Sequence, residues 1–310
     1  MPIFEIADGV FSSVEQIAFS SEKELQTLVE TNLKIVFNCR FVASEFWTGS
    51  QHAGRIDTLA LSEENNPVII EYKRVESSEL INQSLFYLHW LADHCGDFEL
   101  AARRKLGNDI TVDWSDIRVI CIAPDYRKYD LHAVQVMGAN IELWRYRLYA
   151  NNILHLEEVH RTSASGGILI DEGKDPVMVE AGRKAAITRT TGVYTFEEHL
   201  ENKPEKIKNL AMLVQEYILL LDSALEEVPK KFYVAYRLTQ NIVCMEVQMR
   251  RLLLYVKLDP KKLGSLPDNA RDVSEIGHYG TGDLELSIRT EDELNIAKPF
   301  IEMAYKKVGG

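Results

Sequence analysis

Two acidic residues and a lysine lie on neighbouring predicted strands early in the chain. Asp57 lies in a run of alternating apolar and polar residues, Arg55–Ser62. Glu71 and Lys73 lie at the polar end of a second run, Val68–Lys73. A short polar turn joins the two runs, so the strands can bring these side chains to one end of a sheet. Because side chains alternate along a strand, Glu71 and Lys73 project from the same face.

These residue types fit the hydrolysis of phosphodiesters. Two carboxylates, with a backbone carbonyl such as that of Ile70, can hold Mg²⁺ or Mn²⁺ through oxygen ligands. The ion lowers the pKa of its water and supplies hydroxide for attack on phosphorus. Lys73 can orient that water or stabilise the charge on the phosphoryl oxygens. The alternative interpretation is a solvated sheet edge with cross-strand ion pairs, which a bare Asp and Glu-x-Lys pattern more often marks.

The segments around these residues resemble a nuclease superfamily. HAGRIDTLAL, VIIEYKR and INQSLFYLHWL are similar, in order and spacing, to motifs of the PD-(D/E)XK superfamily, and in particular of its RecB-like branch. The corresponding positions are Gly54–Asp57, Glu71–Lys73 and Gln83–Tyr87. The resemblance covers about residues 20–155. It implies an α/β fold of the restriction-endonuclease type, with a mixed sheet flanked by helices.

The resemblance also implies roles for individual residues. Asp57 and Glu71 would hold the metal ion. Lys73 would be catalytic, and Gln83 and Tyr87 would support the site. The last two are four residues apart on a predicted helix, so they face the same side.

The superfamily usually adds a glutamate from the first helix. The segment SEKEL looks like the start of that helix, which favours Glu22 as a further catalytic residue. Glu24 and Glu30 are rivals, and a carboxylate at a helix N-terminus can instead interact with the helix dipole. Ile56 precedes Asp57, at the position of the proline in the Pro-Asp pair after which the superfamily is named.

Basic residues of the first domain are candidates for binding a nucleic acid. Arg55 precedes Asp57 by two residues, and Arg103, Arg104 and Lys105 form a dense cluster. The cluster can contact a phosphate backbone, or it can cap the C-terminal end of a helix.

The pattern of helices and strands predicts two domains. We expect a nuclease-like domain over 1–160, a linker over 161–193 rich in Gly, Ser, Thr and basic residues, and an α+β domain over 194–310. The first domain reads as a helix, a three-strand meander and then alternating helices and strands, which indicates an α/β sandwich with a mixed sheet.

The second domain reads as a long helix, Pro204–Glu227, then several strands, and a final helix, Glu291–Lys307. It resembles a family of unknown function that is sometimes labelled a predicted transport protein. Its lysines and arginines lie among Tyr233, Tyr236 and Tyr255. That pattern fits either a nucleic-acid-binding face or, as the blander interpretation, a solvated sheet edge with core tyrosines.

Composition restricts the class of protein. The 310 residues carry a net charge of −12. Residues 1–160 hold 14 Lys and Arg against 24 Asp and Glu, a net charge of −10. An acidic domain counts against nucleic-acid binding, but a metal site also needs clustered carboxylates, so charge does not exclude it.

Four scattered cysteines argue against a zinc ribbon or a disulfide framework and favour a cytoplasmic protein. We expect no membrane span and no secretory signal.

The sequence therefore predicts a cytoplasmic, Mg²⁺- or Mn²⁺-dependent endonuclease that acts on DNA, in repair or defence. The alternative is a protein that keeps the nuclease fold and binds nucleic acid or partners with little cleavage of its own. A homodimer is compatible with either interpretation.

Overall fold

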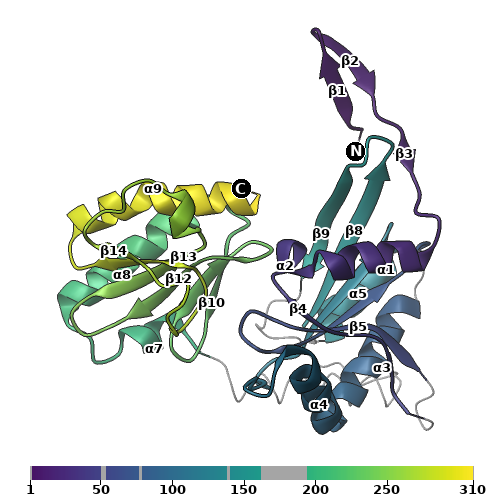
Figure 1. The fold of residues 1–310 in the computed structure, drawn as a ribbon, viewed down its shortest axis with the longest axis horizontal. Coiled ribbons are helices and arrows are strands. Elements are labelled where there is room, and N and C mark those ends of the chain that lie inside the picture. Colours follow the sequence, from purple (N-terminus) through teal and green to yellow (C-terminus); the bar gives the residue numbers. More distant parts are fainter. Residues whose placement is uncertain (1, 50–53, 77–78, 138–139, 162–193, 310) are drawn as a thin grey trace. The chain divides into compact units, whose positions relative to one another are not determined.

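The computed structural model describes residues 2–49, 54–76, 79–137, 140–161 and 194–309 (Figure 1). The chain divides into two compact units, Met1–Thr191 and Gly192–Gly310, and each is described by itself. Apart from Arg161, the linker predicted over 161–193 lies outside the described residues. The predicted fold class is confirmed. The first unit is α/β, with a mixed sheet flanked by helices, and the second is α+β.

The first unit is built on a seven-stranded mixed sheet in the order β3-β8-β7-β6-β5-β4, with β9 pairing with β8. Strands β4, β5 and β6 are antiparallel neighbours, whereas β6, β7 and β8 run parallel. The strands are β3 (Gln16–Ile17), β4 (Arg40–Trp47), β5 (Arg55–Leu61), β6 (Pro67–Tyr72), β7 (Arg118–Ala123), β8 (Ile141–Tyr149) and β9 (Leu154–Arg161). A separate hairpin precedes them, formed by β1 (Phe4–Ala7) and β2 (Val10–Ser13).

Helices cover both faces of this sheet. Helices α1 (Glu22–Thr31) and α2 (Leu33–Val36) pack on one face, and α3 (Glu79–Asp93), α4 (Cys95–Leu106) and α5 (Lys128–Met137) pack on the other. The central strand β6 is buried along its whole length. Its side chains alternate, with Val68 and Ile70 in the core under α1 and Ile69 in the core under α3.

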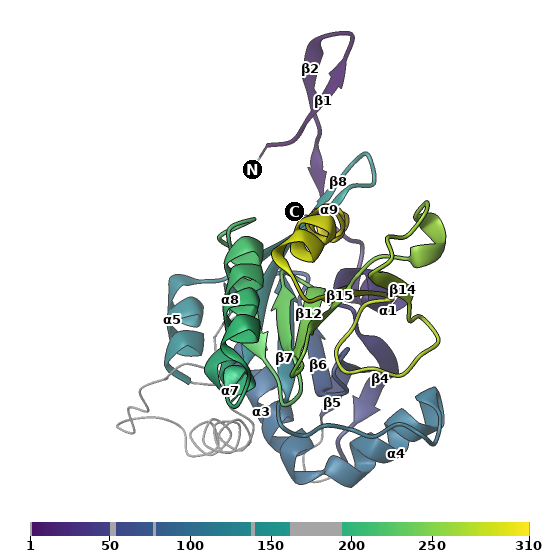
Figure 2. The ribbon, with the colours of Figure 1, turned by 90° about the vertical axis from the view of Figure 1, so that its left-hand side faces the viewer.

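The second unit is a six-stranded antiparallel sheet in the order β10-β11-β12-β13-β15-β14. The long helices α8 and α9 pack against each other and over one face of this sheet (Figure 2). The strands are β10 (Glu226–Pro229), β11 (Val234–Arg237), β12 (Asn241–Val247), β13 (Leu252–Val256), β14 (Ala270–Asp272) and β15 (Leu284–Ile288). The helices are α7 (Phe196–Leu200), α8 (Glu205–Leu219), α9 (Glu291–Val308) and the short 3₁₀ turn η1 (Pro260–Lys262).

The long helix predicted over Pro204–Glu227 is wrong at its C-terminal end. Helix α8 ends at Leu219, and Glu226 already begins β10. The Asp222 carboxylate accepts a hydrogen bond from the Ala224 backbone N–H at 2.9 Å, which stabilises a turn in place of a further helical turn. In the first unit, helix α4 and the strands β1, β2, β3 and β9 were not predicted from the sequence, whereas β7 and β8 were.

Candidate active site

The pairing of β5 with β6 stops next to the predicted acidic pair. Thr58 and Ile70 are partners in the antiparallel ladder. Beyond them, side chains continue the contact between the strands. The backbone N–H of Asp57 donates to Glu71 Oε1 at 3.0 Å, and the backbone N–H of Tyr72 donates to Asp57 Oδ2 at 3.1 Å. The two carboxylates are therefore held side by side at the carboxyl end of β6.

The surroundings of this pair disfavour the charged form of both carboxylates. Glu71 is fully buried, and burial together with the charge of Asp57 holds the pKa of Glu71 well above its usual value. Burial also raises the pKa of Asp57 to about 6, although the Tyr72 N–H and Lys73 act in the opposite direction. Among the described residues, Glu71 Oε2 has no hydrogen-bond partner. A buried carboxylate oxygen without a partner is costly, and a bound cation would remove that cost.

The donor set of Asp57 and Glu71 fits a hard divalent cation. Mg²⁺ is usually held by one or two carboxylates, while waters and substrate phosphates complete its shell. Within the described ranges, no group of three or more His, Cys, Asp and Glu side chains is arranged to hold a metal ion. A cation at this site would therefore depend on these two carboxylates, with oxygen atoms from the backbone, water or substrate completing its shell.

Lys73 and Glu22 meet at the end of β6. The Lys73 backbone N–H donates to the Ile122 carbonyl on β7 at 2.9 Å, which extends the sheet by one bond. Its ammonium lies 3.4 Å from Glu22 Oε1, and the other oxygen of Glu22 accepts from the Arg74 backbone N–H at 3.0 Å. Glu22 is the first residue of α1, and the Ser21 side chain caps that helix. The structure thus places Glu22 beside Lys73.

The two rival glutamates of α1 have other partners. Glu24 accepts hydrogen bonds from both the backbone and the hydroxyl of Ser20, and these bonds lower its pKa. Glu30 accepts from the Thr58 hydroxyl at 2.7 Å, on the α1 side of β5. Of the three glutamates, Glu22 is the one that pairs with Lys73.

Gln83 and Tyr87 of α3 lie close to the carboxylate pair and connect this helix to β5. Gln83 Nε2 donates to the Tyr87 hydroxyl at 3.2 Å, and the Arg55 backbone N–H donates to the same oxygen at 3.1 Å. Burial raises the pKa of Tyr87, and the charges of Glu71 and Asp57 raise it further. The tyrosine therefore connects α3 to the start of β5, close to both carboxylates.

The predicted basic residues divide between two places. The Arg55 side chain is exposed and lies 3.8 Å from Glu45. Arg103, Arg104 and Lys105 instead occupy the last turn of α4, as expected for residues at a helix C-terminus.

The structure does not bring this cluster to the carboxylate pair. Arg103 pairs with Glu99 at 3.2 Å, and the Lys105 ammonium lies over the Phe41 ring, 5.2 Å from its centre. Phe41 is near the start of β4, whereas the end of that strand lies beside Arg55.

Two residues close to the site were missed by sequence reasoning. Gln26 of α1 is buried, and its Nε2 donates to the Asp57 carbonyl at 2.7 Å. A glutamine beside the apolar positions Leu25 and Val29 was the available signal. Glu45 has a left-handed backbone, with φ of +51°, and its carboxylate lies 3.0 Å from Lys23. Its sequence context carries no turn signal such as Gly or Asn.

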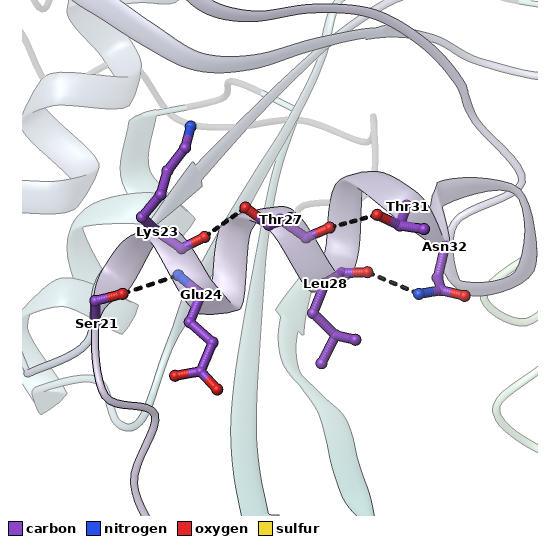
Figure 3. A pocket seen from close by; sticks show the side chains of 7 residues that line it. All are labelled: Ser21, Lys23, Glu24, Thr27, Leu28, Thr31 and Asn32. Carbon is purple, nitrogen blue, oxygen red and sulfur yellow. Dashed lines mark hydrogen bonds between the residues drawn. The ribbon is translucent and has the colours of Figure 1, made fainter.

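A surface depression runs along α1 but is not part of this site (Figure 3). Its polar groups serve the helix itself: the Thr27 and Thr31 hydroxyls donate to backbone carbonyls one turn earlier, and the Asn32 amide donates to the Leu28 carbonyl. The residues that line it are Ser21, Lys23, Glu24, Thr27, Leu28, Thr31 and Asn32. The carboxylate pair does not line it.

The three tyrosines named in the sequence of the second unit are core residues. Tyr236 lies under the helices, while Tyr233 and Tyr255 belong to a small apolar cluster, and all three are buried. For these three tyrosines the structure supports the core interpretation, whereas the rings of Phe232 and Tyr279 in the same unit are exposed.

The comparisons with known proteins include a relative that this chain matches over almost its whole length. An uncharacterized protein of Haemophilus influenzae is 31% identical over 312 residues, covering 99% of this chain and all of that protein. Residues 196–307 match the family model described as a domain of unknown function, DUF5655. This range corresponds to the second unit.

Two solved structures show a weaker similarity. One is a complex of EndoMS with double-stranded DNA, with 19% identity, a TM-score of 0.25 and coverage of 42% of this chain and 47% of that one. The other is a repair endonuclease from Pyrococcus abyssi, with 16% identity, a TM-score of 0.24 and coverage of 42% and 49%. The chain thus spans about half of each, and similarity at this level assigns neither a fold nor an activity to it.

The described helices include none that is long and apolar enough to cross a membrane. All four cysteines are free thiols, as the sequence predicts.

Proposed function

This chain belongs to the family of the Haemophilus influenzae protein that it matches over its whole length, and we propose that it is a metal-dependent nuclease that hydrolyses phosphodiester bonds of DNA. The observation that carries the proposal is the buried Glu71 carboxylate, whose Oε2 has no hydrogen-bond partner among the described residues, beside Asp57 and within reach of Lys73. A purely structural pair would have its buried oxygens satisfied by protein donors.

The motifs around this pair support a finer assignment. The Gly54–Asp57 strand, the Glu71–Lys73 strand and the Gln83–Tyr87 helix occur in the order of the PD-(D/E)XK superfamily. We therefore propose membership of its RecB-like branch for residues 20–155. The second unit, residues 194–310, would bind the substrate or a partner.

The carboxylates would hold Mg²⁺ or Mn²⁺. When bound there, the ion would lower the pKa of a water molecule and stabilise negative charge on a phosphate. Asp57 and Glu71 would bind it as carboxylates, because the cation offsets the burial that now raises their pKa. Their reciprocal hydrogen bonds to the two strands keep both side chains in place before a ligand arrives.

Lys73 would supply the positive charge that the reaction needs outside the carboxylate pair. Its ammonium would stabilise the charge that develops on the phosphoryl oxygens. Glu22 holds that ammonium at 3.4 Å and is itself fixed by the Arg74 backbone, so it acts as a positioning residue for Lys73. Gln83 and Tyr87 would hold the start of β5 against α3.

Cleavage of DNA by the purified full-length chain tests the proposal. Supercoiled plasmid, single-stranded DNA, duplex DNA and RNA are incubated with Mg²⁺, with Mn²⁺ and with EDTA. We expect nicking that needs the metal and disappears in Asp57→Asn. Glu24→Gln is the matched control, because this glutamate lies on α1 two residues from Glu22 but bonds to Ser20. Metal-independent cleavage, or equal cleavage by Asp57→Asn, contradicts the proposal. Tight DNA binding without any cleavage supports the binding-protein alternative.

A further inference from the structure

An exposed tryptophan lies at the end of β4, the strand that pairs with the one carrying Asp57. Trp47, the last residue of β4, is 54% exposed, whereas Trp90 and Trp144 are each 3% exposed. Trp47 is the register partner of Arg55 across the β4–β5 pair, so their side chains are neighbours. Arg55 is two residues from Asp57 on β5, a separation of ~7 Å along a strand. A nucleotide next to a phosphate bound at Asp57 would therefore be within reach of the indole.

The backbone that carries the tryptophan is fixed on both strands. The Thr48 backbone N–H donates to the Gly54 carbonyl at 3.1 Å, and the Gly54 N–H donates to the Thr48 hydroxyl at 3.1 Å. Thr48 is itself buried. On β5, the Arg55 N–H bonds to the Tyr87 hydroxyl. The exposed indole thus lies on an ordered element of the sheet, which lowers the entropy cost of binding a ligand to it.

Arg55 provides a positive charge beside Trp47 that can bind a phosphate. Its side chain is 63% exposed, and its ion pair with Glu45 is long, at 3.8 Å. An exposed pair of this kind contributes little free energy. The guanidinium can therefore exchange Glu45 for a phosphate, which it can bind through two parallel hydrogen bonds.

We propose that Trp47 and Arg55 form a nucleotide subsite, with a base stacked on the indole and its phosphate on the guanidinium. The inference rests on the proposed nuclease function and names its substrate more closely. Both faces of a base inside a duplex are covered by neighbouring bases. The subsite therefore takes DNA in which the base beside the cleaved bond is unpaired, and stacking of this kind is tolerant of sequence.

Binding measurements without cleavage test the subsite. In the Asp57→Asn background, the affinity for a single-stranded oligonucleotide and for the same sequence as a duplex is measured at fixed salt. Trp47→Ala should weaken single-strand binding by about tenfold. It should change duplex binding by less than about twofold. Trp47→Phe should retain most of the single-strand affinity, because a phenyl ring still stacks. Ile35→Ala, which removes another exposed apolar side chain of the first unit, is the control and should have no effect.

Fluorescence provides a second measurement. Stacking on Trp47 should quench part of the tryptophan emission on addition of single-stranded DNA, and Trp47→Phe should abolish that part. Equal losses for both DNA forms in Trp47→Ala, or no loss for either, overturn the subsite. A wild-type protein that cleaves DNA while Trp47→Ala binds normally leaves the nuclease proposal intact. A wild-type protein that neither binds nor cleaves DNA contradicts both the subsite and the nuclease function.

Discussion

Asp57 and Glu71 are joined by reciprocal hydrogen bonds in which each carboxylate accepts from the backbone of the opposite strand. The Asp57 N–H donates to Glu71, and the Tyr72 N–H, next to Glu71, donates to Asp57. These bonds fix two acidic groups in a buried place where charge is disfavoured. Holding two carboxylates there lowers the stability of the fold in the absence of a ligand. Such a cost is expected at a site that binds a cation.

The first prediction follows from this cost. Glu71→Gln keeps the shape and the acceptor for the Asp57 N–H but removes the buried charge. In EDTA at pH 8, we expect the variant to be more stable than wild type by about 1–3 kcal/mol, the cost of a buried polar group without a partner. Thermal unfolding measures the difference, and calorimetry should show that Mn²⁺ binding is lost.

The raised pKa values also determine how the stability difference between Glu71→Gln and wild type changes with pH. Burial raises the folded pKa of Asp57 to about 6, and that of Glu71 is raised too. Groups with a raised pKa contribute stability that is present below their unfolded values, near pH 4, and is lost as pH rises through the folded value. The advantage of Glu71→Gln over wild type should therefore shrink from pH 8 to pH 4. An advantage that grows toward acid pH would contradict the assigned environment.

The second prediction concerns Lys73. If its ammonium stabilises charge in the transition state, Lys73→Ala should lower single-turnover cleavage by ~10²-fold or more, with little change in DNA affinity. Lys73→Arg should restore little of the rate, because a planar guanidinium does not replace a compact ammonium. Rapid-quench measurements at saturating protein separate the rate from binding. Full cleavage by Lys73→Ala would remove the catalytic assignment.

The third prediction concerns Gly54. A Cβ atom at this position would lie 2.8 Å from Tyr87 Cε1 and 3.0 Å from its hydroxyl oxygen. The tyrosine is held by Gln83 and by the Arg55 N–H, so the ring must shift and weaken these bonds. Gly54→Ala should cost about 1–3 kcal/mol in the free energy of unfolding.

Gly96 supplies the control for this substitution. It lies in α4 with no atom within 4 Å of the added Cβ, so Gly96→Ala should be neutral or stabilising. Denaturation of both variants in urea provides the comparison. Equal stability of the two would show that Tyr87 moves aside freely.

The sequence was informative where local rules set the geometry. A hairpin register brings Asp57 to Glu71, and a spacing of four residues on a helix aligns Gln83 with Tyr87. Each of these relations depends on a few residues that are close in the sequence and on the regular geometry of a single hairpin or helix.

The remaining features depend on tertiary packing. Gln26 reaches the Asp57 carbonyl only because α1 packs across β5. Tyr236 and Tyr255 lie on β11 and β13, but the sequence pattern does not reveal that their side chains are buried. The end of α8 depends on one carboxylate that forms a turn, and the apolar pattern continues beyond it.

The fourth prediction concerns the two units. We propose that residues 194–310 form an independent domain, because their core of α8, α9 and the antiparallel sheet is drawn from this range alone. A fragment of these residues should unfold cooperatively, with the circular dichroism of an α+β protein. A fragment that remains unfolded would show that the second unit needs the first.

The last prediction separates the backbone of Glu45 from its side chain. Its chain neighbours Ser44 and Phe46 pair with Thr58 and Ile56, which places Glu45 opposite Asp57 on β5. Its φ of +51° lies in the left-handed region, which costs an L-residue other than Gly or Asn about 1–2 kcal/mol. The ion pairs of its carboxylate with Lys23 and Arg55 offset part of this cost.

Glu45→Ala and Glu45→Gly remove the same carboxylate, but only the glycine variant also relieves the backbone. In an ordinary strand glycine is the less stable of the two by about 0.5–1 kcal/mol. At this position the order should reverse, with Glu45→Gly more stable than Glu45→Ala by about 1 kcal/mol. Urea denaturation of the two variants measures the difference. If alanine is the more stable, the left-handed conformation opposite Asp57 is relaxed at little cost, and β4 does not hold strain beside the carboxylate pair.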